Sequence, residues 1–286
     1  MMIKKRLVLQ KIWFSTFRLA VLINGTALCV MVYFILSRGF RAISWEFISQ
    51  APRDSMTAGG ILPCIVGTIC LCLMTLFVAL PIGVASAIYL NEYATQGKRV
   101  RFIRLGINNL AGVPSIVFGL FGLAFFCIVF KMGVSIASGG LTLGIMTLPV
   151  IIGASEEALR AVPNTYREAS LAMGATQWQT IKNVVLPTAF PGIITGSILG
   201  ISRAAGETAP IMYTGAVFFT PDLPSSILDE VMALPYHIYV LATAGTQIEA
   251  TRHLQYGMAL VSIVLVFGMN LFAIILRSKM RKKMRI

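Results

Sequence analysis

Charged residues are so unevenly spread along this chain that they leave six long apolar segments between them. Each segment reaches or exceeds the roughly 18–20 apolar residues that an α-helix needs to cross a bilayer. The pattern therefore predicts six membrane-spanning helices, at 19–37, 55–91, 105–130, 132–155, 183–202 and 254–276.

Two segments need separate treatment. The segment 55–91 is longer than one crossing requires, and glycines and prolines near its start predict a loop there, while Pro81-Ile82-Gly83 predicts a kink. The segment 231–248 carries several polar residues and would place the two ends of the chain on opposite sides of the membrane. We predict that it is interfacial or re-entrant rather than spanning.

The composition agrees with a membrane protein. Hydrophobic residues make up 57% of the chain and charged residues only 12%, against about 25% charged in an ordinary soluble domain. A soluble fold is excluded because it would have too few polar residues to cover its surface. The predicted fold class is an all-α integral membrane protein with six transmembrane helices.

The net charge of +13 is explained by its distribution. Eighteen of the 24 basic residues fall at the two ends of the chain and in the loops 91–104 and 156–182, and five fall in the opposite loops. Because basic residues collect on the cytoplasmic side, both termini are predicted to be cytoplasmic. The chain then divides into a basic N-terminus (1–18), a transmembrane domain (19–276) and a basic tail (277–286). The charge gives no support for nucleic-acid binding.

The predicted cytoplasmic loop 155–187 has helix signals of its own. Thr165-Tyr166-Arg167-Glu168 reads as a capping box that opens a short helix running to Met173, with Gly174 as its C-cap. Thr176-Gln177-Trp178-Gln179 reads as a second capping box, whose helix would end before Pro187. The pattern predicts a rigid knob of two helices, which is either a connector or a docking point for a soluble partner.

The same loop resembles the EAA loop of ABC importer permeases. Glu168-Ala169-Ser170 is followed by Gly174 and then by Val184 and Leu186-Pro187 at the spacing of that motif, with Ser170 in place of Ala and Val184 in place of Ile. The resemblance implies that this loop docks in an ATPase subunit. It assigns the coupling role to five residues: Glu168, Ala169, Gly174, Leu186 and Pro187.

The fifth predicted span carries glycines at four-residue intervals, Gly192, Gly196 and Gly200. On a helical wheel they share a face with Arg203 and Glu207. Small residues let a neighbouring helix or a substrate approach the backbone closely, and the sequence leaves both readings open.

Arg203 directly follows the uncharged segment 183–202 and is the only basic residue that we assign to a spanning helix rather than to a loop or a terminus. It lies roughly 18 Å along the helix from Pro191, where a charge costs at least about 2.5–3.5 kcal/mol. Glu207, four residues later, offsets part of this cost. A structural ion pair is one reading. We favour a pathway role, because a guanidinium group suits an oxyanion such as phosphate or sulfate.

The segment Arg203–Pro210 resembles the R-x-x-G-E-T-A-P segment of the A-type permease of the phosphate-specific (Pst) ABC transporters. The stretches Pro81–Tyr93 and Gly112–Leu120, and Leu234-Pro235 with the aromatic residues after it, are also similar. The resemblance implies a type I ABC importer permease fold and a place in the substrate pathway for Arg203 and Glu207, with Thr208 in the same motif. It also implies a bacterial or archaeal plasma-membrane location and three kinds of partner: a homologous C-type permease, two ATP-binding subunits and an extracytoplasmic phosphate-binding protein.

Several chemistries have no sequence support. There is no GxxxxGK[ST] loop, so ATP and Mg²⁺ are expected on a partner subunit, and this chain is not expected to be an enzyme or to bind a cofactor. No Cys or His grouping has metal-ligand spacing, so no metal site is predicted. Three alternatives remain: a permease for phosphonate, sulfate or molybdate; an ATP-independent transporter or channel, which often shows inverted repeats; and an intramembrane enzyme, for which Glu207 is the only deep acid.

Overall fold

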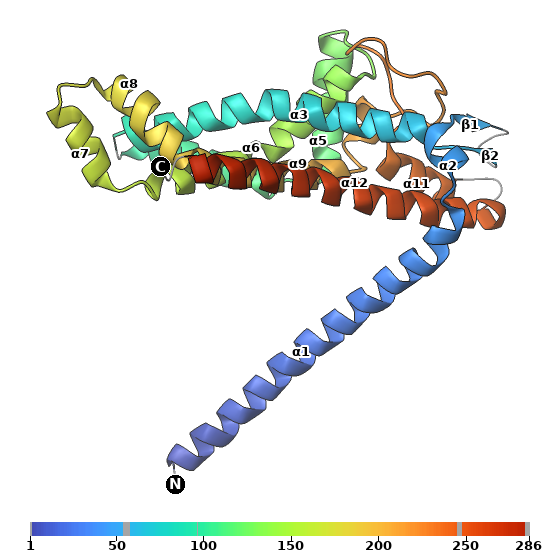
Figure 1. Cartoon of the computed structure of the whole chain (residues 1–286), viewed down its shortest axis with the longest axis horizontal. Helices are drawn as coiled ribbons and strands as arrows, with labels where there is room; N and C mark the ends of the chain where they lie inside the picture. The colour runs from blue at the N-terminus through green and yellow to red at the C-terminus, as the bar shows by residue number, and fades with distance from the viewer. Residues whose placement is uncertain (1, 54–57, 96, 245–247, 284–286) are drawn as a thin grey trace.

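The computed structural model describes residues 2–53, 58–95, 97–244 and 248–283. Long helices dominate it, and Figure 1 shows four of them lying side by side along the length of the molecule. These four are α3 (Leu62–Ile88), α6 (Ile136–Arg160), α9 (Leu186–Gly206) and α12 (Ile248–Lys283). The predicted all-α fold class is confirmed.

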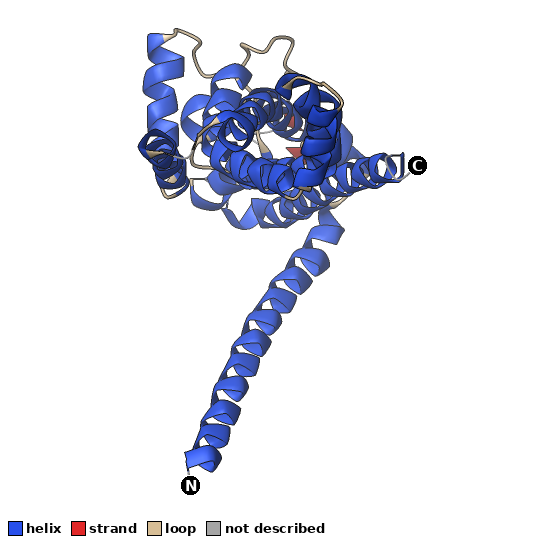
Figure 2. Ribbon diagram, turned by 90° about the vertical axis from the view of Figure 1, so that its left-hand side faces the viewer, coloured by secondary structure: helices blue, strands red, loops and turns tan. Residues whose placement is uncertain are grey.

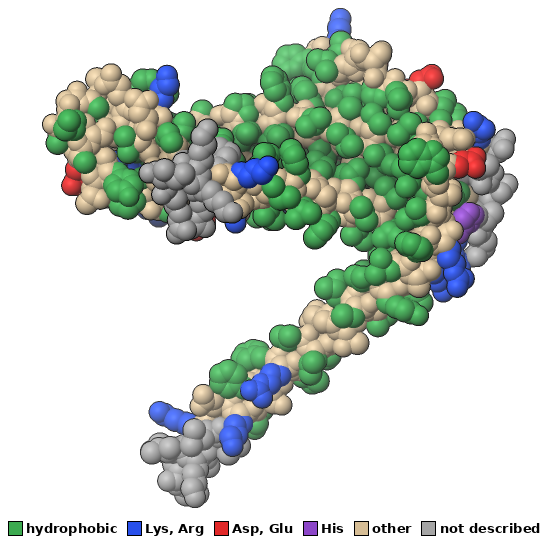
Figure 3. Space-filling view, in the orientation of Figure 1, with side chains coloured by type: hydrophobic (Ala, Val, Ile, Leu, Met, Phe, Trp, Pro, Cys, Tyr) green, Lys and Arg blue, Asp and Glu red, His purple; other side chains and the backbone are tan. Residues whose placement is uncertain are grey.

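Five helices in the described part of the chain are long and apolar enough to cross a membrane. They correspond to five of the six predicted spans. The segments are Gln10–Ala42, Leu62–Tyr93, Ile136–Arg160, Gln177–Gly206 and Thr251–Lys279. Hydrophobic side chains cover most of the side of the bundle seen in Figure 3, as expected of a surface that faces lipid.

The predicted third span, 105–130, is not one straight helix. It is divided between α4 (Lys98–Ala111) and α5 (Ser115–Gly122), which continues into a π-helical turn, η4 (Leu123–Val129). The two parts meet at 100°, so the chain has six spans only if this bent pair counts as one. The cause is Pro114, which has φ −58° and ψ 140° and disfavours a helical conformation in the residue before it.

Helix α1 (Met2–Gly39) leaves the bundle at an angle, as Figures 1 and 2 show. It meets α12 only near its end, where the Arg38 guanidinium lies 5.4 Å from the centre of the Tyr256 ring. A Cβ atom on Gly39 would lie 2.6 Å from the Tyr256 carbonyl oxygen, so this contact requires glycine. The start of α1 and the end of α12 both point toward the end of the bundle that carries α7 and α8 (Figure 1).

Short elements gather at the opposite end of the bundle. They are η1 (Phe40–Ala42), α2 (Trp45–Ser49), the antiparallel pair β1 (Pro52–Arg53) and β2 (Ala58–Gly59), α10 (Ile211–Thr214) and α11 (Leu234–Thr243). Helix α11 lies in the segment predicted to be interfacial or re-entrant, of which residues 245–247 are outside the described part. Its ten residues span only about 15 Å, too short for a crossing.

Helix α6 is the centre of the bundle. In its most apolar stretch 72% of the residues are buried, compared with 6% in α12. In the first half of α6, Leu143 and Met146 join Leu71 of α3 and Ala204 of α9 in a buried cluster. At its C-terminal end, Leu159 packs with residues of α3 and α9. Both flanking helices therefore depend on α6 for their positions.

Candidate functional site

Two short helices project from one end of the bundle and form a knob, which we define as residues 164–180 (Figure 1). They are α7 (Asn164–Ala172) and α8 (Gln177–Thr180). Gly174 between them has φ +84°, the left-handed conformation expected of a C-cap glycine. Its N–H donates to the Leu171 carbonyl at 2.9 Å. The Ser170 and Thr180 hydroxyl oxygens, 2.9 Å apart, join the two helices.

One of the two predicted capping boxes forms. The Thr176 hydroxyl accepts the Gln179 N–H at 3.3 Å, and the Gln179 side chain accepts the Thr176 N–H at 2.8 Å. The box predicted at Thr165 is wrong. Helix α7 begins at Asn164, directly after Pro163, and no side chain caps it. Thr165 is therefore the second helical residue and not the N-cap, so its side chain does not occupy the position from which a capping box forms.

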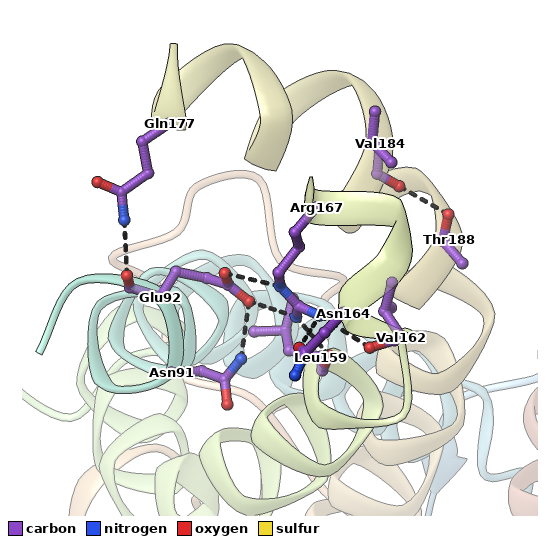
Figure 4. A network of polar contacts seen from close by, with 9 residues as sticks. All are labelled: Asn91, Glu92, Leu159, Val162, Asn164, Arg167, Gln177, Val184 and Thr188. Carbon is purple, nitrogen blue, oxygen red and sulfur yellow. Dashed lines mark hydrogen bonds and ion pairs between the residues drawn. The ribbon is translucent and has the colours of Figure 1, made fainter. Parts of the chain in front are cut away.

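The prediction that the second knob helix ends before Pro187 is also wrong. Helix α8 runs through a π-helical turn, η5 (Ile181–Val185), into α9, so that Gln177–Gly206 is one continuous helix. Proline has no N–H, and its ring clashes with the carbonyl one turn earlier. The wider π turn relieves this clash, and the Thr188 hydroxyl donates to the Val184 carbonyl at 2.6 Å (Figure 4).

The predicted coupling residues do not all lie together. Glu168, Ala169 and Gly174 are exposed on the knob. Leu186 and Pro187 lie at the start of α9, and Leu186 packs against the buried cluster at that end of the bundle.

Large apolar side chains on the knob were not singled out from the sequence. Met173 is 89% exposed, and three others are about half exposed: Tyr166, Leu171 and Trp178. The sequence did carry a signal for them, because they are large apolar residues in a loop outside every predicted span. Such residues gathered on a projecting element are typical of a protein-docking surface.

Arg203 and Glu207 form the predicted ion pair at the other end of α9. The Arg203 Nε atom lies 3.3 Å from the Glu207 Oε1 atom. Helix α9 ends at Gly206, and Glu207 follows it in an extended conformation. The helical-wheel position predicted for Glu207 is therefore wrong. The helix ends here because Pro210 has no N–H to donate to the Gly206 carbonyl.

The ion pair is not enclosed by this chain. The Arg203 side chain is 48% exposed and that of Glu207 19%. Thr208, next in the chain, is half-buried, and its carbonyl accepts the Met212 N–H at 3.1 Å. The guanidinium group therefore faces whatever lies beside this chain in the membrane.

The glycine stripe faces α6 of the same chain. A Cβ atom on Gly196 would lie 2.2 Å from the Ala154 Cβ atom, and one on Gly192 would lie 2.6 Å from that of Ala158. At Gly200 the nearest atom is Cγ1 of Ile151, at 3.2 Å. The backbones of α9 and α6 approach closely along this line, so no room remains for a substrate at Gly196. Farther along α9, beyond these glycines, the Arg203 side chain is exposed.

Polar groups continue along α9 toward the knob. The Ser202 hydroxyl hydrogen-bonds to the Asn270 side chain of α12. Arg277, which the charge pattern placed in the basic tail, belongs to α12 and donates to the Thr195 hydroxyl at 2.8 Å. Thr195 is exposed and Arg277 is half-buried. A second guanidinium group therefore lies beside the membrane-spanning part of α9.

Comparison with known proteins agrees with this geometry. A family model described as binding-protein-dependent transport system inner membrane component matches residues 79–286. The probable ABC transporter permease protein YqgI of Bacillus subtilis is 33% identical over 276 residues, which cover 92% of this chain and 94% of the relative. The phosphate transport system permease protein PstA of Mycobacterium leprae is 36% identical over 244 residues, 83% of this chain and 78% of the relative.

A solved structure shows the same fold. It is the methionine ABC transporter MetNI in an inward-facing conformation, with a TM-score of 0.62 and 18% sequence identity. The match covers 77% of this chain and 95% of that chain.

Proposed function

The chain belongs to the family of binding-protein-dependent transport system inner membrane components and is a permease subunit of an ABC importer, and from this premise we propose that it carries inorganic phosphate. Its fold is that of the type I ABC importer permeases, so the fold class and the family both agree with what the sequence resembles. Relatives that are about one-third identical over most of the chain are phosphate transport permeases.

The observation that carries the phosphate proposal is the half-exposed guanidinium group of Arg203 in a membrane-spanning helix. A cation at this depth is costly, and it is retained where it serves a pathway. The planar fork of five N–H donors matches the oxygens of a tetrahedral anion. Glu207 holds the Arg203 side chain between passages, and its negative charge keeps the anion from binding too tightly to leave. Thr208 lies beside this pair and offers a further hydroxyl group.

The exposure of Arg203 also supports a partner in the membrane. A charge that this chain leaves half exposed needs a wall on its other side to exclude lipid. A homologous C-type permease would supply that wall and complete the pathway. An extracytoplasmic binding protein would deliver phosphate at the end of the bundle opposite the knob.

The knob supports docking of two ATP-binding subunits, one on each permease. Its exposed Tyr166, Met173 and Trp178 are apolar groups of the kind that anchor protein interfaces. The excess of basic residues at the two ends of the chain and in the loops on the knob side supports a cytoplasmic location for this end and for both termini, in a bacterial or archaeal cell. The ATP and Mg²⁺ would be held by the partner, so this chain acts without catalysing a reaction.

The test is uptake of labelled phosphate by vesicles that contain the full complex, with sulfate, molybdate and a phosphonate as competitors. Arg203→Gln removes the charge and should lower uptake by about 10- to 100-fold, because one or two charge-assisted hydrogen bonds to the anion would be lost. Arg101→Gln, an exposed arginine of α4, is the matched control and should leave uptake unchanged.

Normal phosphate uptake by Arg203→Gln would refute the pathway role. If another oxyanion competes more strongly than unlabelled phosphate does, that anion and not phosphate would be the substrate. Uptake without any ATP-binding subunit would favour an ATP-independent transporter instead. Docking is tested separately by Glu168→Lys, which should reduce co-purification of the ATP-binding subunits.

A further inference from the structure

The end of α3 carries a side-chain network that the transport pathway does not use. Helix α3 passes at this end into a π-helical turn, η3 (Tyr89–Tyr93), which contains Glu92. The Glu92 side chain is only 8% exposed. Turns of this type occur frequently at functional sites. Figure 4 shows the carboxylate pointing toward the guanidinium group of Arg167, which comes from α7 of the knob.

The contact between Glu92 and Arg167 is a two-point ion pair. The Arg167 Nη2 atom donates to Glu92 Oε1 at 2.7 Å, and Nε donates to Oε2 at 3.1 Å. Bidentate pairs of this kind fix orientation as well as distance. The Asn91 side chain also donates to Glu92 Oε1, at 2.7 Å, and so helps to hold the carboxylate in place.

The remaining Arg167 donors attach it to the end of α6. Nη2 also donates to the Leu159 carbonyl at 2.9 Å, and Nη1 donates to the Val162 carbonyl at 2.8 Å. A further bond runs from Nη1 to the Asn164 side chain at 3.3 Å. These carbonyls lie at the C-terminus of α6, where helices leave such groups without partners. All five N–H groups of Arg167 are thus occupied, and one side chain joins α3, α6 and α7.

A second bond ties the other knob helix to the same residue. The side-chain amide of Gln177, the first residue of α8, donates to the Glu92 backbone carbonyl at 2.7 Å. The π turn is also held from α4, because Arg104 donates to the Leu90 carbonyl at 3.2 Å. Glu92 therefore accepts hydrogen bonds from both helices of the knob, two from Arg167 of α7 and one from Gln177 of α8, although the chain does not lead directly from α3 into the knob.

This arrangement controls how the knob can move. The chain enters the knob through residues 161–163, a short non-helical link. If α7 could swing about that link, a push on its exposed face would tilt α7 and leave α3 and α6 where they are. Among the spanning helices, only α9 is joined to the knob by continuous helical backbone, through α8 and η5. The bonds from Arg167 and Gln177 to Glu92 block that swing. They also bring α3 into the body that moves with α6 and α9.

We propose that Glu92 and Arg167 are positioning residues that lock the knob to α3 and α6, so that movement of a docked ATP-binding subunit is converted into movement of the spanning helices. The proposal rests on the docking role in the proposed function. It predicts a defect in coupling, with assembly and ATP hydrolysis retained. Neither residue touches the transported anion.

The experiment uses the full complex in proteoliposomes and measures three quantities: co-purified ATP-binding subunit, ATP hydrolysis, and phosphate taken up per ATP hydrolysed. Glu92→Gln keeps the size of the side chain and removes its charge. Arg167→Gln breaks the same link from the other side. Each should lower uptake per ATP about tenfold, equivalent to about 1.4 kcal/mol, with co-purification unchanged.

The double variant should be no worse than either single variant, because both act through one link. The matched control is Arg160→Gln. Arg160 lies at the same end of the bundle, pairs with Glu156 at 3.3 Å with its side chain 58% exposed, and should keep the wild-type ratio.

Two results would overturn the proposal while docking stands: unchanged uptake per ATP in both variants, or additive losses in the double variant. A parallel fall in co-purification and uptake would also overturn it, since the pair would then serve docking itself. If the wild-type complex binds no ATP-binding subunit, the proposed function fails instead.

Discussion

A close approach between two spanning helices gives a quantitative prediction about packing. Gly196 of α9 faces Ala154 of α6, and a Cβ atom at position 196 would lie 2.2 Å from the Ala154 Cβ atom. Carbon atoms pack at about 3.5–4.0 Å, so Gly196→Ala must push the two helices apart by more than about 1 Å. Neither atom belongs to a flexible side chain that could turn aside.

The expected cost follows from two opposing contributions. Overpacking costs about 1–3 kcal/mol, while replacing glycine by alanine within a helix returns roughly 0.5–1 kcal/mol. The net loss for Gly196→Ala is about 1–2 kcal/mol. At about 2–4 °C per kcal/mol, the melting temperature of the purified protein in detergent should fall by roughly 2–8 °C.

A compensating substitution tests the cause. Ala154→Gly removes the atom that the new methyl group meets, so the double variant should recover most of the lost melting temperature. Gly268→Ala is the control, because a Cβ atom there has no neighbour within 4 Å, and it should be neutral or slightly stabilising. The assay is the fraction of monodisperse protein after heating. An unchanged melting temperature for Gly196→Ala, or no recovery in the double variant, would show that the helices do not meet as described.

Three further outcomes are expected. Thr68→Val removes the hydroxyl that accepts the Leu234 N–H at 2.9 Å and should cost about 1–3 kcal/mol of stability, because the buried N–H is left unpaired. The control is Thr75→Val, whose hydroxyl donates to the Leu71 carbonyl of its own helix; a melting-temperature loss for Thr68→Val no larger than for this control would contradict the reasoning. Gly174→Ala should cost about 1 kcal/mol, because φ is +84° and no atom lies nearby, and hydrogen exchange should rise in residues 164–180 alone; equal exchange would count against the corner geometry. Burial lowers the pKa of His237 in α11 to about 4 from 6.5, so the unfolded chain binds a proton between these pH values that the folded chain does not. Stability should therefore fall by about 3 kcal/mol as pH drops from 6.5 to 4, and a His237→Phe variant that melts with the same pH dependence would disprove this source.

Local patterns in the sequence were reliable where one helical turn contains all the interacting atoms. The Thr176–Gln179 capping box and the left-handed Gly174 are both present, because their partners lie within a few residues. The capping box at Thr165 did not form although its residues fit the pattern, since the N-cap of α7 is Pro163, two residues earlier. The effect of each proline on its helix was the hardest feature to predict. Pro114 divides a predicted span, whereas α3 continues through Pro81, and the helix that leads from η5 into α9 continues through Pro187.

The candidate sites were found in part. The EAA-like motif identified the knob, and the isolated charge identified Arg203, because both signals are local. The exposure of the Arg203 side chain could not be predicted from the sequence, since helical-wheel geometry placed Arg203 with glycines that in fact face α6. The Glu92–Arg167 ion pair could not be found from the sequence for another reason: the two residues are 75 positions apart, and no periodicity joins them.

The sequence by itself therefore determined the membrane character and the approximate positions of the spans, because the bilayer sets the length of apolar segments and the placement of charge. Its local motifs indicated the family. The tertiary structure decided which face of α9 is closed against α6, where the third span bends, and how the knob is attached to α3. These depend on the close approach of helix backbones and on side chains from distant parts of the chain, which only the packed fold brings within hydrogen-bonding distance.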